Sequence, residues 1–126
     1  MISAPTTDEL KLTGLSRKSI VLASTSEARR EILERAGLEV QIDPPQIDEK
    51  EFKRSTHENR MDAATLAASL AEQKAYSITR RHPGVLVIGA DQILEYEGRW
   101  FEKPQDQDDA AETLRTLRGC THRLIC

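Results

Sequence analysis

Apolar residues occur in short runs separated by amphipathic stretches, and this pattern predicts alternating strands and helices. The β-branched run Ser19–Ala23 predicts a buried strand. The next stretch, Glu27–Ala36, predicts a helix, with Gly37 at the position of a C-terminal cap. Alternation from Leu38 to Ile42 then predicts a second strand. The apolar face of the helix consists of Ala28, Ile32, Leu33 and Ala36.

In the middle of the chain, Pro44-Pro45 end regular pairing and place Asp48-Glu49 in a loop. The segment Ser55–Glu58 has the form of a capping box and predicts a long helix from about His57 to Arg81, which Pro83-Gly84 end. Its apolar face is mostly small and consists of Met61, Ala64, Leu66, Ala68, Ala71, Ala75 and Ile78.

The second half continues the alternation. Val85–Ala90 predicts a strand buried on both faces. A helix is expected over Asp106–Leu117, followed by Gly119 and a further strand from Thr121. Between them a hairpin is expected from Ile93–Tyr96 and Arg99–Phe101, joined by Glu97-Gly98. Together these elements predict an α/β domain over residues 19–126, preceded by a polar tail over residues 1–18.

Composition narrows the class of protein. The 126 residues suffice for one domain, and 38% hydrophobic with 31% charged residues is typical of a globular chain. The net charge of -3 argues against nucleic acid or an anionic membrane as partner, and no apolar run is long enough to span a bilayer. Cys120 and Cys126 are too few for a disulfide framework. The expected location is therefore the cytoplasm.

The first candidate site is Ser24-Thr25-Ser26, which lies between the first strand and the first helix. Unpaired backbone N–H groups and the helix dipole favour an anion at such a position, and the serine hydroxyls add donors. Arg29 lies one turn into the helix, where its guanidinium can fork onto phosphate oxygens. The alternative is that Ser26 only caps the helix and Arg29 is solvated.

The second candidate is Asp91, which directly follows the run Val85–Ala90. Ligands of open α/β sheets bind beyond the carboxyl ends of strands, where this carboxylate could hold Mg²⁺ or orient a water. Asp48 and Glu49 could complete an oxygen-ligand site. The alternatives are that Asp91 only turns the chain into the hairpin and that Asp48 and Glu49 are solvated surface. Lys74 either snorkels or points into a site, and Lys103 is a weak signal alone.

Several ordered motifs resemble one family, the Maf proteins, also described as septum-formation inhibitors and as nucleotide pyrophosphatases. The Ser-x-Ser-x-x-Arg pattern of Ser24–Arg29 resembles the opening signature of that family. Each motif is weak, but their order over residues 19–126 is specific. The further matching blocks are Ile47–Glu49, Ala71–Ala75, Ile88–Gln92, Glu102–Pro104 and Leu117–His122.

The resemblance implies a mixed central sheet flanked by helices, as in Maf and inosine-triphosphatase-like folds. It implies a cytoplasmic hydrolase of nucleotide metabolism that converts a nucleoside triphosphate to its monophosphate and pyrophosphate with a divalent cation, Mg²⁺ or Mn²⁺. Asp91 would be the catalytic residue and, with Glu49, a metal ligand. Gln92 is similar to the branch that acts on 7-methyl-GTP and could read a base edge. The implied phosphate contacts are Ser24, Ser26, Arg29, Lys74 and Lys103.

Two departures from the family pattern stand out. Glu27 and Ala28 replace a common Pro and Arg, which removes one cation near the phosphates. Members of the family also continue past the strand that begins at Thr121, so the domain is expected to be incomplete at the C-terminus, with an exposed sheet edge that favours association and leaves a homodimer open. The alternatives to an enzyme are a non-catalytic nucleotide-binding or cell-division module and a structural remnant without a ligand.

Overall fold

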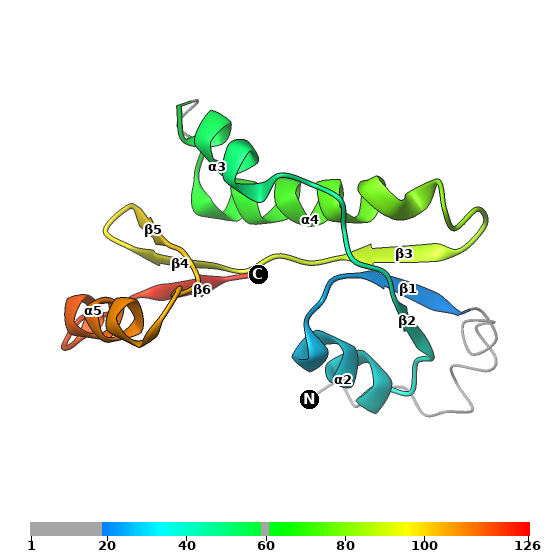
Figure 1. Cartoon of the computed structure of the whole chain (residues 1–126), viewed down its shortest axis with the longest axis horizontal. Coiled ribbons are helices and arrows are strands. Elements are labelled where there is room, and N and C mark those ends of the chain that lie inside the picture. The colour runs from blue at the N-terminus through cyan, green and yellow to red at the C-terminus, as the bar shows by residue number, and fades with distance from the viewer. Residues whose placement is uncertain (1–18, 59–60) are drawn as a thin grey trace, which may run out of the picture. The chain divides into compact units, whose positions relative to one another are not determined.

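The structure is a computed structural model that describes residues 19–58 and 61–126 (Figure 1). The predicted tail, residues 1–18, lies outside the described residues. The chain divides into two compact units: residues 19–48 with 71–90, and residues 49–58 and 61–70 with 91–126. The elements, in chain order, are β1 (Ile20–Ala23), α2 (Glu27–Arg35), β2 (Val40–Ile42), α3 (Glu49–Glu58), α4 (Ala63–Thr79), β3 (Leu86–Gly89), β4 (Ile93–Tyr96), β5 (Arg99–Phe101), α5 (Gln107–Leu117) and β6 (Arg123–Ile125).

The first unit is built on a parallel sheet in the strand order β2-β1-β3. All four residues of β1 are buried, as their apolar and β-branched character predicts. The strand β3 is an edge of this sheet, and its first residue, Leu86, is exposed. The prediction that this run is buried on both faces is therefore wrong, because the central position belongs to β1.

The register of the parallel strands fixes where their carboxyl ends lie. Ala23 of β1 pairs with Gly89 of β3, so that Ser24 and Ala90 follow at the same edge of the sheet. This is the edge at which ligands of α/β sheets bind. Ser24 and Ala90 are therefore neighbours in space, although they lie far apart in the sequence.

The helix α2 begins and ends as predicted. Ser26 is its N-cap, and Gly37 adopts a φ of 86°, the left-handed conformation that ends helices. The predicted apolar face, however, is not buried in the described part of the chain, since α2 has no buried residue and Ile32 is 66% exposed. The sequence predicted the helix from its periodicity, but a periodicity does not show what packs against it.

The C-terminal half of α4 packs closely on the first sheet. Ile78 joins Val21 and Ala23 in a buried cluster, with Val85 and Val87 against it. The approach is closest at Gly89, where an added Cβ would overlap the Ala71 carbonyl oxygen and lie 3.0 Å from the Ala75 Cβ. Only glycine fits at this position.

A polar clamp joins the end of β2 to the end of α4. The Asp43 carboxylate accepts hydrogen bonds from Arg81, at 3.1 Å from Nε and 2.7 Å from Nη2. The Nε2 atom of His82 lies 2.6 Å from Oδ2, the same oxygen that accepts the Arg81 Nε–H. These partners, Arg81 first, lower the pKa of Asp43 below its ordinary value.

The long helix expected from about His57 to Arg81 is in fact two helices, α3 and α4. The predicted capping box is wrong, because Ser55 lies inside α3 and its hydroxyl donates to the Phe52 carbonyl. Asp62 caps α4 instead, accepting the Thr65 N–H at 2.9 Å. The buried face of α4 is also rotated from the predicted one. It consists of Ala63, Leu66, Ala67, Leu70, Lys74 and Ile78, whereas Ala64 and Ala68 are exposed.

The second unit contains an antiparallel sheet in the order β5-β4-β6. The predicted hairpin is confirmed, with Glu97 at φ 50° and Gly98 at φ 75°, the values of a two-residue turn with both φ angles positive. The predicted last strand is β6, which pairs with β4. The predicted helix is α5, whose N-cap Asp106 accepts the Asp109 N–H at 2.8 Å.

The expected fold class, α/β, is confirmed. Parallel and antiparallel strands are both present among the described residues, and they form two three-stranded sheets with helices between the strands. No helix in the described ranges is long and apolar enough to cross a membrane.

Candidate functional site

The turn between β1 and α2 is stabilised by its own serine hydroxyls. The Ser24 hydroxyl is buried and accepts the Ser26 N–H at 3.0 Å. The Ser26 hydroxyl accepts the Arg29 N–H at 3.3 Å, which confirms that Ser26 caps the helix. Capping does not exclude binding, because Oγ keeps a proton to donate and the first turn of a helix has further N–H groups to offer.

Arg29 reaches from α2 to the carboxyl edge of the parallel sheet. Its Nη1 donates to the Ala90 carbonyl at 3.1 Å and lies 3.4 Å from the Ser24 hydroxyl. The solvated alternative for Arg29 is therefore wrong, since the side chain is half-buried and held at two points. The Ala90 carbonyl was missed by sequence reasoning, because a backbone acceptor has no signal in the amino-acid sequence.

Lys74 lies on the buried face of α4, as its position among apolar residues predicted. Its side chain is 6% exposed, between the buried positions Leu70 and Ile78 on the same helix face. A cation enclosed to this degree needs polar or anionic neighbours to offset its desolvation. Lys74 is thus enclosed rather than extended into solvent.

The other predicted residues, apart from Asp48, belong to the second unit. Asp91 is 7% exposed and lies in extended chain between β3 and β4 rather than in a turn. Gln92 and Lys103 are exposed. Glu49 is not in a loop, as was expected, but is the first residue of α3, where its charge complements the positive end of the helix dipole. Asp48 remains in the preceding loop and is exposed.

Few carboxylates among the described residues are candidates to bind the expected divalent cation. Among the described residues there is no group of three or more His, Cys, Asp or Glu side chains that could hold a metal ion. Mg²⁺ typically takes one or two carboxylates and completes its shell with water and substrate phosphates. The hard oxygen donors of Asp91 and Glu49 fit that chemistry, and their shared use by one ion stays a prediction.

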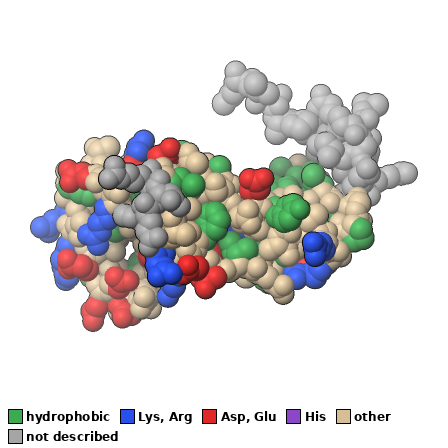
Figure 2. Space-filling model, turned by 90° about the horizontal axis from the view of Figure 1, so that it is seen from above, with side chains coloured by type: hydrophobic (Ala, Val, Ile, Leu, Met, Phe, Trp, Pro, Cys, Tyr) green, Lys and Arg blue, Asp and Glu red, His purple; other side chains and the backbone are tan. Residues whose placement is uncertain are grey.

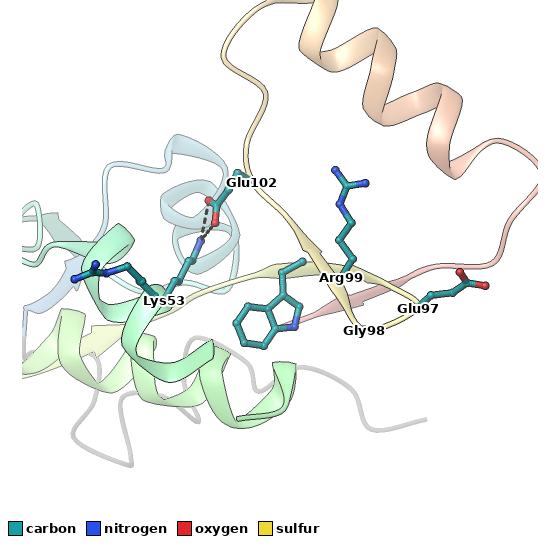
Figure 3. A pocket seen from close by; sticks show the side chains of 7 residues that line it. Lys53, Glu97, Gly98, Arg99 and Glu102 are labelled. Atoms are coloured by element: carbon teal, nitrogen blue, oxygen red, sulfur yellow. Dashed lines mark hydrogen bonds and ion pairs between the residues drawn. The ribbon is translucent and has the colours of Figure 1, made fainter. Parts of the chain in front are cut away.

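A cavity of about 680 Å³ lies between α3 and the β4–β5 hairpin, within the second unit (Figure 3). Lys53 donates to both carboxylate oxygens of Glu102, at 3.2 and 3.0 Å. This ion pair fixes the residue before Lys103, and sequence reasoning missed it because a lone lysine in a charged helix carries no distinguishing pattern. The lining consists of Lys53, Arg54, Glu97, Gly98, Arg99, Trp100 and Glu102.

The charge distribution agrees with the near-neutral composition. On the face shown in Figure 2, Lys and Arg side chains of the described residues are interspersed with Asp and Glu. That face carries no broad field of one sign of the kind that nucleic-acid binding requires.

The first unit thus has a serine-rich turn and a helix N-terminus at the carboxyl edge of a parallel sheet, the arrangement by which α/β proteins bind phosphate groups. The family model described as Maf-like protein matches residues 19–126. The chain belongs to the Maf-like family.

Curated relatives carry names that bear on the activity. A nucleoside triphosphate pyrophosphatase of Paramagnetospirillum magneticum is 45% identical over 104 residues, which are 82% of this chain and 54% of that protein. One of Granulibacter bethesdensis is 42% identical over 84% of this chain and 54% of its own. A 7-methyl-GTP pyrophosphatase of Rhizobium etli is 42% identical over 83% of this chain and 53% of its own. The chain spans about half the length of these relatives.

Proposed function

We propose that this chain takes part in hydrolysing a nucleoside triphosphate to its monophosphate and pyrophosphate. The observation that carries the proposal is the network of Ser24, Ser26, Arg29 and the Ala90 carbonyl at one edge of the parallel sheet. Membership of the Maf-like family and the names of the relatives support the same reaction.

In this reaction a water attacks the α-phosphorus, the bond from that phosphorus to the bridging oxygen breaks, and pyrophosphate leaves with the bonding electrons. Negative charge grows on the bridging and non-bridging oxygens. Arg29, Lys74 and Lys103 are the cations proposed to stabilise it, and the hydroxyls of Ser24 and Ser26 supply neutral donors. Arg29 suits this role because its contacts hold it in position before a phosphate binds.

Asp91 and Glu49 are the residues proposed to hold a divalent cation, Mg²⁺ or Mn²⁺. The cation would supply charge neutralisation and a bound water of lowered pKa. Asp91 is also proposed to orient the attacking water, because its carboxylate oxygens can accept a hydrogen bond from that water.

Gln92 is proposed to read the base. Its exposed amide can donate and accept at once, which suits the edge of a purine. A relative with the name 7-methyl-GTP pyrophosphatase supports a methylated guanine nucleotide as the substrate to test first.

The test is pyrophosphate release from a panel of triphosphates, including 7-methyl-GTP, with and without Mg²⁺ or Mn²⁺. Asp91→Asn and Arg29→Ala are each expected to lower kcat/KM by about 10²-fold or more, the usual effect of removing one group that stabilises developing charge. The matched controls are Asp108→Asn, an exposed carboxylate in α5, and Arg35→Ala, an exposed arginine in α2.

Full activity of Asp91→Asn would refute the role of that carboxylate. Release no faster with the wild-type chain than in buffer without protein, for every metal and triphosphate, would refute the enzyme proposal. Nucleotide binding by calorimetry without any hydrolysis would favour the non-catalytic module instead.

A further inference from the structure

The ion pair between Lys53 and Glu102 joins two segments that each carry a residue of the proposed site. Lys53 belongs to α3, whose first residue is Glu49, a proposed ligand of the divalent cation. Glu102 directly precedes Lys103, a proposed phosphate contact. All four residues lie in the second unit, so the contact is internal to one compact unit.

The Lys53 ammonium contacts the Glu102 carboxylate at both of its oxygens. The distances from Nζ are 3.2 Å to Oε1 and 3.0 Å to Oε2 (Figure 3). The Lys53 side chain is only 20% exposed, whereas the Glu102 side chain is 67% exposed. A partly enclosed ammonium is screened less by solvent than a fully exposed one, and contact with both oxygens fixes the direction of the carboxylate as well as its distance.

On α3, Lys53 lies four residues after Glu49. Residues with this spacing are neighbours on the surface of a helix. The side of α3 that meets Glu102 is therefore also the side near Glu49, and the ion pair links that side of the helix to the segment that carries Lys103.

The segment around Lys103 has little regular structure of its own. The strand β5 ends at Phe101, which pairs with Leu94 of β4. Residues 102–104 follow outside regular secondary structure. Pro104 favours an extended backbone for the residue before it, which is Lys103. With Glu102 held by Lys53, the main chain of Lys103 is constrained on both sides, while its side chain stays exposed.

The expected size of two effects separates positioning from stabilisation. An ion pair with one exposed partner contributes little to folding, because solvent screens it and ordering two long side chains costs entropy. The placement of a group that acts on a substrate matters far more, since a displacement of about 1 Å can lower a rate by about a hundredfold. The Lys53–Glu102 pair should therefore affect ligand binding and activity more than stability.

We propose that Lys53 is a positioning residue, which holds Glu102 and, through it, places Lys103 to contact the phosphates of a nucleoside triphosphate. Lys53 also offsets the negative charge beside Lys103, which would otherwise repel phosphate oxygens. Lys53 touches no substrate atom in this role. The inference rests on the proposed function, because it requires Lys103 to contact phosphate.

The test is a double-mutant cycle between Lys53 and Lys103 in the full 126-residue chain. Lys53→Met and Lys103→Met each keep a long side chain and remove its charge. One readout is kcat/KM for pyrophosphate release from each triphosphate of the panel. The other is the Kd of the same triphosphates by calorimetry with EDTA present, which requires neither metal nor turnover.

Lys53→Met alone is expected to lower kcat/KM and to weaken binding by about tenfold each. In the Lys103→Met background the same change should alter either value by less than about twofold, because residues that act through one another are not additive. Lys53→Arg should keep close to wild-type values, since a guanidinium can also hold a carboxylate at both oxygens.

The matched control is Lys50→Met, which removes the same charge from an exposed lysine of α3. It should leave both readouts unchanged, which separates positioning from a general loss of positive charge on this helix. Thermal unfolding of Lys53→Met should show a change in Tm of no more than about 4 °C.

A loss with Lys53→Met that Lys53→Arg avoids and that disappears in the Lys103→Met background supports the proposal. Equal losses in both backgrounds overturn it, as do wild-type values for Lys53→Met or a much larger fall in Tm. A wild-type chain that binds a triphosphate without hydrolysing it would refute the proposed function, while the binding cycle would still decide the role of Lys53. No binding by the wild-type chain overturns both.

Discussion

Gly89→Ala tests the closest packing contact of the first unit. A methyl group at this position would overlap the Ala71 carbonyl oxygen and lie 3.0 Å from the Ala75 Cβ. The carbonyl belongs to the main chain of α4 and cannot rotate away, so the helix or the strand must move. We expect the substitution to lower the free energy of unfolding by about 3 kcal/mol, the upper part of the range for overpacked cores.

That loss is large against a typical total of 5–15 kcal/mol, and for a domain of this size it corresponds to a fall in Tm of roughly 12 °C or more. Urea and thermal unfolding followed by circular dichroism measure it. Gly84→Ala is the control. Gly84 has a φ of 73° but no atom within 4 Å of an added Cβ, so that variant pays only the conformational cost of about 1 kcal/mol.

A second variant separates the two contacts. Ala75→Gly removes the side-chain neighbour but leaves the Ala71 carbonyl in place. The double variant should therefore be no more stable than Gly89→Ala alone, since glycine inside a helix costs about 1 kcal/mol by itself. A Gly89→Ala chain that melts within a degree or two of the wild-type chain would show that α4 does not pack on β3 in this way.

Two further predictions concern polar contacts. Asp43→Asn should lower the urea midpoint at pH 7, because it removes the negative charge and one of the two acceptor oxygens that Arg81 and His82 use. Folding lowers the pKa of Asp43, so the stabilisation by this carboxylate is present above the unfolded pKa of about 3.9 and is lost as the pH falls through the folded pKa. The urea midpoints of the Asp43→Asn and wild-type chains should therefore converge below about pH 4. A difference between the two midpoints that stays constant down to about pH 2 contradicts this. Asp106→Ala should cost about 1 kcal/mol by removing the N-cap of α5, with Asp108→Ala as the control, and equal midpoints for the two would contradict the capping role.

The sequence predicts most elements because their signals are local. Ser26, Gly37 and Asp106 mark helix ends through hydrogen bonds and backbone angles that involve only neighbouring residues. The turn Glu97-Gly98 is predicted for the same reason. Local chemistry also explains the error at Ser55, since a serine followed three residues later by a glutamate occurs inside helices as well as at their starts.

The sequence does not predict the order of the strands in a sheet or which elements pack against each other. The central place of β1, the edge position of β3 and the exposed face of α2 depend on pairing between distant segments. The same holds for the candidate site. Ser26 and Lys74 lie where the pattern placed them, whereas the link from Arg29 to the Ala90 carbonyl follows from strand register alone.

The way in which Arg29 is held has a consequence for how the chain meets a ligand. Its partners are a hydroxyl and a main-chain carbonyl, both electrically neutral, and within the described ranges it forms no salt bridge with a carboxylate. The guanidinium of Arg29 is therefore held in position without a carboxylate that neutralises its charge. An incoming polyanion would find a full positive charge already oriented and would have no internal counter-ion to expel before it could bind.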